Sequence, residues 1–207
     1  MKIKFLGHSA FLIDDLLTDP FIKNNPICPI KVEDIKCKII CVTHDHHDHL
    51  GDAFEIAKNN DATIVGIYDM VKEADEKGLK TELMNIGGPI KVENWEIRLV
   101  PATHSGNPIG FVLKKDNKTI YHAGDTGLFM DMMLIGEYNI DVALLPIGGR
   151  YTMDIEQAVE ACKMLKCKKV IPMHYNTWNT IEANPEGFKK KAPCDVIILK
   201  SGETFEV

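Results

Sequence analysis

The alternation of apolar and polar residues divides the chain into short strands and a few helices. In the first half the pattern predicts helices at 51–58 and 69–77, and strands at 2–6, 10–13, 16–18, 38–42 and 62–67. In the second half it predicts helices at 154–165 and 185–191, and strands at 89–92, 96–100, 110–114, 119–122, 141–145, 169–172 and 196–199. Asp154 and Gln157 have the spacing of a helix-capping box. This order of elements favours two packed sheets that are covered by helices.

The length of 207 residues fits one domain, or two small half-domains that share a core. Because no Gly/Ser/Pro-rich linker interrupts the chain, we predict a single domain over 1–207. The net charge of -6 argues against non-specific binding to nucleic acid or to an anionic membrane. No segment has the ~20 apolar residues of a bilayer span, and residues 1–8 are typical of a strand rather than a signal peptide. We therefore expect a cytoplasmic protein with no membrane partner; a homo-oligomer is left open.

The six cysteines are predicted to be reduced. None of them forms a C-x-x-C pair, and a chain of this length does not need disulfides to stabilise its core. Cys41 lies in an apolar run, where a thiol packs as a small hydrophobic group. The others are Cys28, Cys37, Cys162, Cys167 and Cys194.

The densest polar cluster, residues 43–49, follows the strand at 38–42 and precedes a helix. It holds four histidines and two aspartates, a composition that has no packing purpose in a core or on a surface. Imidazole and carboxylate groups together suit zinc, with manganese or iron as alternatives. His44 and His46 point the same way in an extended segment, whereas Asp48 and His49 can reach a neighbouring ion. The spacing therefore predicts two metal sites, against the alternative of a solvated polar loop.

The motif H-x-H-x-D-H, formed by His44, His46, Asp48 and His49, resembles the signature of the metallo-β-lactamase superfamily. Asp45 and His47 stand at positions to which that pattern assigns no role. The resemblance implies further ligands in a fixed order, each following a strand. These are His104, Asp125 and His174.

Segments 6–10, 18–20, 121–127 and 146–149 make the chain similar to the UPF0173 type of metal-dependent hydrolase, which is related to the ascorbate-6-phosphate lactonases. This resemblance implies an α+β, αββα four-layer sandwich, with two mixed sheets packed face to face and helices on the outer faces. One position departs from the family pattern: Arg150 stands where a histidine is expected.

The resemblance also implies two divalent ions, with zinc as the first choice. His44, His46 and His104 would hold one ion, and Asp48, His49 and His174 the other. Asp125 would bridge them. Two such ions activate a water molecule as hydroxide, and either Asp48 or a bound water passes the proton to the leaving group. A redox di-iron relative would have glutamate at the position of His46, so hydrolysis is favoured.

The expected function is hydrolysis of a small ester, lactone or phosphorylated carbohydrate. One alternative is a phosphodiesterase acting on a nucleotide or a phospholipid head group, and another is a metal-binding or sensing protein with little turnover. Arg150 is a candidate for gripping an anionic part of the substrate; a surface position or a salt bridge to the helix at 154–165 is the alternative. His8 is a candidate for contacting the substrate or, equally, for a buried, hydrogen-bonded role. His122 is expected to be structural.

Overall fold

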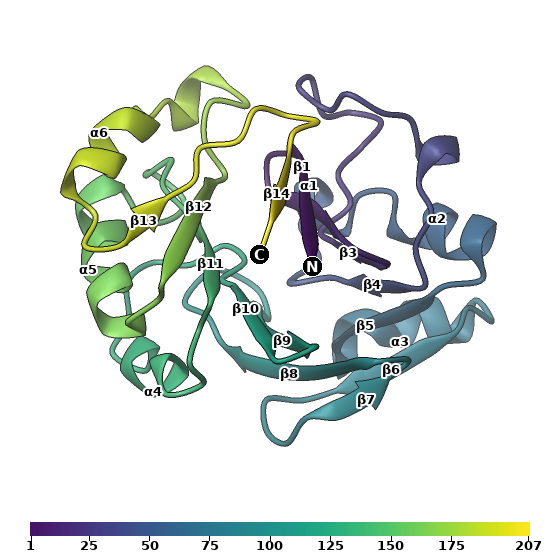
Figure 1. Ribbon diagram of the computed structural model, residues 1–207. Coiled ribbons are helices and arrows are strands. Elements are labelled where there is room, and N and C mark those ends of the chain that lie inside the picture. Colours follow the sequence, from purple (N-terminus) through teal and green to yellow (C-terminus); the bar gives the residue numbers. More distant parts are fainter. The chain divides into compact units, whose positions relative to one another are not determined.

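The computed structural model describes residues 1–207, and the chain divides into two compact units. Unit 1 comprises residues 1–86 and 199–206, and unit 2 comprises residues 87–198 and 207. Each unit contains one seven-stranded sheet (Figure 1). The single domain expected over 1–207 stays a prediction.

The sheet of unit 1, here called sheet A, has antiparallel pairing from β14 to β3 and parallel pairing from β3 to β6. Its strands in spatial order are β14 (Thr204–Glu206), β1 (Lys2–Gly7), β2 (Ala10–Ile13), β3 (Leu16–Thr18), β4 (Ile39–Cys41), β5 (Thr63–Ile67) and β6 (Thr81–Met84). All residues of β3 and β4 are buried, as expected of parallel strands that are covered on both faces. The carboxyl ends of β3 and β4 therefore meet at one edge.

Three helices and one short 3-10 turn complete unit 1. The turn η1 (Val32–Asp34) and α1 (His47–Leu50) lie in the connections on either side of β4. The helices α2 (Ala53–Asn60) and α3 (Tyr68–Glu76) bury their small and branched side chains against the parallel strands, in one cluster with Leu17, Ile40 and Ile64. This apolar core fixes the strand ends from which the polar loop at 43–49 extends.

The sheet of unit 2, here called sheet B, is antiparallel from β7 to β10 and parallel from β10 to β13. Its strands in spatial order are β13 (Asp195–Val196), β12 (Lys169–Met173), β11 (Val142–Pro146), β10 (Lys118–His122), β9 (Ile109–Lys115), β8 (Trp95–Pro101) and β7 (Ile90–Val92). The parallel strands give this sheet two distinct edges. One edge carries the residues that follow the strands, and the other carries the residues that precede them.

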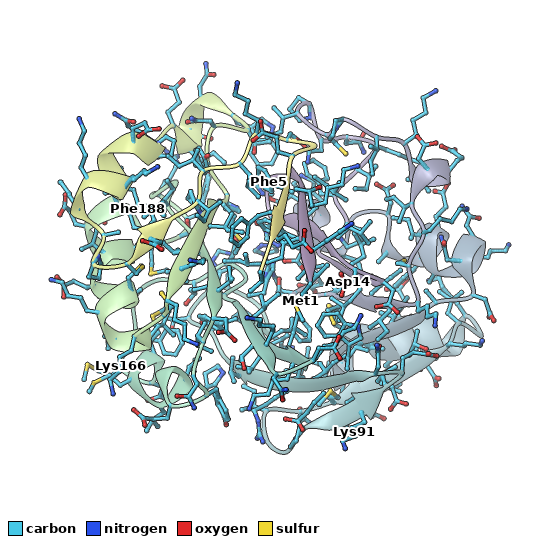
Figure 2. All side chains as sticks on the ribbon, in the orientation of Figure 1. Met1, Phe5, Asp14, Lys91, Lys166 and Phe188 are labelled. Atoms are coloured by element: carbon cyan, nitrogen blue, oxygen red, sulfur yellow. The ribbon has the colours of Figure 1, made fainter.

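The helices of unit 2 are α4 (Met132–Gly136), α5 (Ile155–Leu165) and α6 (Pro185–Lys191), with a 3-10 turn η2 (Asn179–Ile181). Figure 1 shows α5 and α6 beside β11, β12 and β13. Asp154 caps α5 as predicted, since its side chain accepts a hydrogen bond from the Gln157 amide at 2.9 Å. The Phe188 ring of α6, labelled in Figure 2, is fully buried.

The predicted elements are present, with several boundary shifts and omissions. The strand expected at 196–199 is only Asp195–Val196, and the sequence pattern missed β6, β14 and α4. The predicted fold class is confirmed, since the chain forms two mixed sheets accompanied by helices. None of the helices combines the length and the apolar character that a membrane span requires.

Candidate metal centre

The candidate ligands of unit 1 lie on the loop between β4 and α1. Within it, the Nε2 atom of His44 and the Nδ1 atom of His46 are 2.9 Å apart. Two nitrogens that bind one ion at about 2.0–2.1 Å are separated by about 2.9–3.4 Å, depending on the coordination geometry. The two imidazoles are thus arranged as neighbouring ligands of one ion, on the same side of the loop as their spacing predicted.

His49 is held by a buried carboxylate that sequence reasoning did not assign to the site. Asp19 Oδ2 lies 2.8 Å from His49 Nδ1 and 2.8 Å from Thr43 Oγ1, and Asp19 Oδ1 accepts from the Thr43 amide at 2.8 Å. The side chains of Asp19 and His49 are both fully buried. Metal-binding histidines commonly give their second nitrogen to a carboxylate in this way. The contact through Nδ1 therefore fixes the orientation of the His49 ring and makes Nε2 the nitrogen that would bind a metal.

Asp19 could have been recognised from its position at the end of a strand. Asp19 directly follows β3, and β3 pairs in parallel with β4, so the carboxyl ends of the two strands meet beside the ligand loop. Sequence reasoning used Asp19 only as part of segment 18–20, which supports the family resemblance. The Asp19 backbone is in the left-handed region, with φ 40°, which turns the carboxylate back towards Thr43.

His8 contacts Asp48, the remaining candidate ligand of this loop. The His8 Nε2 atom lies 3.1 Å from Asp48 Oδ2, and the His8 side chain is fully buried in the turn between β1 and β2. This contact fits the buried, hydrogen-bonded role for His8. By contrast, the His47 side chain is 81% exposed and Asp45 is exposed, which agrees with their lack of an assigned role.

The candidate ligands of unit 2 come from three separate loops, each after a strand of sheet B. His104 follows β8, Asp125 follows β10 and His174 follows β12. Asp125 Oδ2 lies 3.1 Å from His174 Nε2 and 3.8 Å from His104 Nε2. A single carboxylate oxygen therefore faces both imidazoles, at distances close to those between two atoms that bind the same metal ion.

Backbone geometry holds these three loops in place. His174 is in the left-handed region, with φ 51°, and a Cβ atom on Gly148 would lie 2.3 Å from the His174 carbonyl oxygen. Only glycine can occupy position 148 without displacing His174. The Thr126 hydroxyl accepts from the Thr103 amide at 3.0 Å, which ties the loop of Asp125 to the loop of His104.

Two further candidates in unit 2 have different surroundings. His122 is fully buried, and its Nδ1 atom accepts from the Gly124 amide at 3.1 Å, which fits the structural role expected for it. Arg150 lies on the loop that leaves β11, and this loop contacts the Asp125 loop through a hydrogen bond from the Met153 amide to the Thr126 carbonyl (2.9 Å). The exposed Arg150 guanidinium stacks on the Tyr151 ring at 5.3 Å. Arg150 thus belongs to the ligand edge of sheet B.

The donor atoms present in both units fit a divalent transition-metal ion. Each group combines imidazole nitrogens with a carboxylate, and this is a ligand set that zinc, manganese and iron accept. Arg150 offers no lone pair and cannot be a ligand. The residues of the two units therefore supply donor atoms of the kind that such an ion requires.

Comparison with known proteins identifies the family. The Beta-lactamase superfamily domain matches residues 11–175. A UPF0173 metal-dependent hydrolase of Staphylothermus marinus is 50% identical, over 98% of this chain and 97% of the relative. One from Pelotomaculum thermopropionicum is 46% identical over the full length of both. The solved structure of Igni18, a metallo hydrolase from Ignicoccus hospitalis, has a TM-score of 0.92 and 43% identity, over 100% of this chain and 98% of that one.

The chain therefore belongs to the β-lactamase superfamily and, within it, to the UPF0173 metal-dependent hydrolases. The family and the metallo-β-lactamase fold inferred from H-x-H-x-D-H are both confirmed.

Proposed function

We propose that this hydrolase cleaves a small ester, lactone or phosphorylated carbohydrate with two divalent ions. The observation that carries the proposal is the convergence of donor atoms in each unit: His44 with His46 at 2.9 Å, and Asp125 with His174 at 3.1 Å. Four candidate ligands lie in unit 1 and three in unit 2. Their total is larger than the four ligands of one tetrahedral zinc.

In this proposal His44, His46 and His104 hold one ion, while Asp48, His49 and His174 hold the other. Asp125 is shared. Zinc is the first choice, and manganese or iron are the alternatives. When bound, such ions lower the pKa of water towards ~7, which makes hydroxide available at neutral pH.

The chain's own residues supply orientation and proton handling. Asp19 fixes the ring of His49 through its Nδ1 atom. His8 fixes Asp48 through Oδ2, and in this proposal Asp48 passes a proton to the leaving group. Because the His8 side chain is fully buried, His8 acts through Asp48 as a positioning residue rather than by touching the substrate. Arg150 binds an anionic part of the substrate with parallel charge-assisted hydrogen bonds.

Metal analysis tests the ligand assignment. Protein stripped of metal and resupplied with zinc or manganese should approach two equivalents per chain. His46→Ala should lower the metal content and the turnover, whereas the matched variant of its exposed neighbour, His47→Ala, should change neither. Asp125→Ala should weaken both ions, and His174→Ala mainly one. Saturation at one equivalent would refute the pair of ions.

A substrate panel tests the reaction. Lactones, esters and phosphorylated sugars should be hydrolysed by the loaded protein and not by the stripped protein. Turnover of phosphodiesters alone would replace the proposal with the phosphodiesterase alternative. No turnover by protein that carries its full complement of metal would favour a metal-binding or sensing role.

A further inference from the structure

Three cysteines gather at the edge of sheet B opposite the candidate ligands. Cys167 lies just before β12, and Cys194 lies just before β13. These strands pair in parallel, with Lys169 opposite Asp195, so the two cysteines are brought together by the register of the sheet. The third, Cys162, comes from the last turn of α5, whose C-cap residue, Lys166, has the left-handed conformation.

The separation of the sulfur atoms is that of metal ligands rather than of a disulfide. The Sγ atoms of Cys167 and Cys194 are 3.7 Å apart, and all three Sγ atoms lie within 4.8 Å of one another. A disulfide requires about 2.05 Å. Two thiolates on one tetrahedral zinc, each at about 2.3 Å from the metal, are about 3.8 Å apart.

The cluster is well shielded but open on one side. Cys162 and Cys167 are 1% and 5% exposed, whereas Cys194 is partly exposed. Cys194 therefore gives the cluster access to solvent. Three sulfurs in this arrangement form a site that suits a single ion.

The charge balance of the cluster favours a cation. Hydrogen bonds with the thiols of Cys162 and Cys167 lower the pKa of Cys194. Hydrogen bonds within the cluster, together with burial, raise the pKa of Cys162 far above its ordinary value. A second and a third buried thiolate would repel the first, and a bound metal ion would remove that cost and release the protons.

We propose that Cys162, Cys167 and Cys194 form a separate site that binds one thiophilic ion, zinc or copper(I), through three thiolates. Zinc would take a water molecule as its fourth ligand on the side of Cys194, whereas copper(I) is satisfied by three sulfurs. The largely extended chain between Cys167 and His174 spans about 20 Å, so this ion is distinct from those of the candidate metal centre. It would join the end of α5 to the starts of β12 and β13.

Cobalt substitution tests this site without reference to hydrolysis. Reduced, metal-stripped full-length protein is titrated with Co²⁺, and thiolate-to-cobalt charge transfer is followed in the near ultraviolet. Imidazole and carboxylate ligands do not produce this band, so failure of the hydrolase proposal would not affect the result. We expect the band in the wild type, its loss in Cys194→Ser, and its retention in Cys28→Ser. Cys28 is a matched control because it is also partly exposed but belongs to unit 1.

Elemental analysis then distinguishes the two ions. After loading with Zn²⁺ or with Cu⁺, the wild type should hold one equivalent more of the preferred ion than Cys194→Ser, with equal hydrolase activity. X-ray absorption at the edge of that metal should show metal–sulfur contacts in the wild type that are absent in Cys194→Ser. Equal metal content in the two proteins together with no cobalt–thiolate band would overturn the proposal. So would a Cys167–Cys194 disulfide in protein whose thiols were trapped at lysis.

Discussion

The candidate ligands of unit 1 stand on one loop, whereas those of unit 2 come from three loops that are distant in the chain. In unit 1, side chains hold the ligands: Asp19 and Thr43 bind His49, and His8 binds Asp48. In unit 2, they are held mainly through the backbone: Gly148 approaches the His174 carbonyl closely, and the Thr103 amide donates to the Thr126 hydroxyl. A contiguous motif thus depends on its side-chain supports, and dispersed ligands depend on the sheet that brings them together.

The largest effect is expected from Asp19→Ala. The change removes the acceptor of three contacts, including the one that orients the His49 ring through Nδ1. Loss of such a supporting carboxylate should weaken metal affinity by about 10–100-fold, measured by competition with a coloured chelator. Asp45→Ala, at an exposed position of the same loop, is the control and should bind metal normally. Equal affinity in the two variants would show that side-chain support is unimportant in unit 1.

Gly148→Ala tests the backbone support of unit 2. The added Cβ would lie 2.3 Å from the His174 carbonyl oxygen, so the backbone must shift. We expect a loss of about 1–3 kcal/mol in the free energy of unfolding, together with a lower metal content. Gly87→Ala, where a Cβ would meet nothing within 4 Å, should cost little. Denaturant titration measures both variants, and a Gly148→Ala protein as stable as the control would contradict the close approach.

Arg150→Ala separates substrate binding from metal binding at the ligand edge of unit 2. Removing one charge-assisted contact of roughly 1.5–3 kcal/mol should lower kcat/KM by about one to two powers of ten for an anionic substrate. Neutral analogues and metal content should be unaffected. Arg150→Lys, which keeps the charge but not the paired hydrogen bonds, should lie in between. An equal loss on charged and neutral substrates would leave Arg150 with a structural role.

The smallest effect is expected from Asp141→Asn, which lies at the edge of sheet B away from the ligands. Burial raises the pKa of Asp141, but hydrogen bonds from Lys168 Nζ (2.7 Å) and the Thr119 amide (2.9 Å) outweigh it, and the net shift is downward. Because the folded-state pKa is lowered, this stabilisation is present above the ordinary aspartate pKa and is lost as the pH falls through the folded-state value. The variant should lose about 1 kcal/mol at neutral pH, since Lys168 is exposed.

Unfolding curves at several pH values check this prediction. The difference between Asp141→Asn and the wild type should shrink on acidification, with metal content unchanged at neutral pH. A stability difference that does not vary with pH would show that the ionised Asp141 carboxylate is not the source of the stabilisation. The variant also shows whether a loss of stability alone lowers metal binding in unit 2.

Sequence reasoning singled out the candidate ligands of unit 1 because they are contiguous, and the composition of the loop has no other physical use. His104, Asp125 and His174 were reached only through the order of a known family, since a lone histidine or aspartate after a strand carries little information. Asp19 was missed because its role depends on the pairing of β3 with β4. Pairing between strands cannot be read from a local pattern.

The same limit explains the missed cysteine cluster and the missed elements. Cys194 approaches Cys167 only through the parallel register of β12 and β13. The strand β14 exists because β1 offers it an edge. The helix α4 is short, and its Met133 and Leu134 are exposed, so no amphipathic pattern marked it.

The pairing of β14 with β1 has a consequence for the order in which the chain can fold during synthesis. Unit 2 is almost continuous in sequence, so its sheet can form as soon as residues up to 196 have left the ribosome. Sheet A needs residues 204–206 beside residues 2–4, so the unit that is begun first is completed last. Until then, β1 of the nascent chain carries an unpaired edge, which is the kind of surface that pairs with other chains.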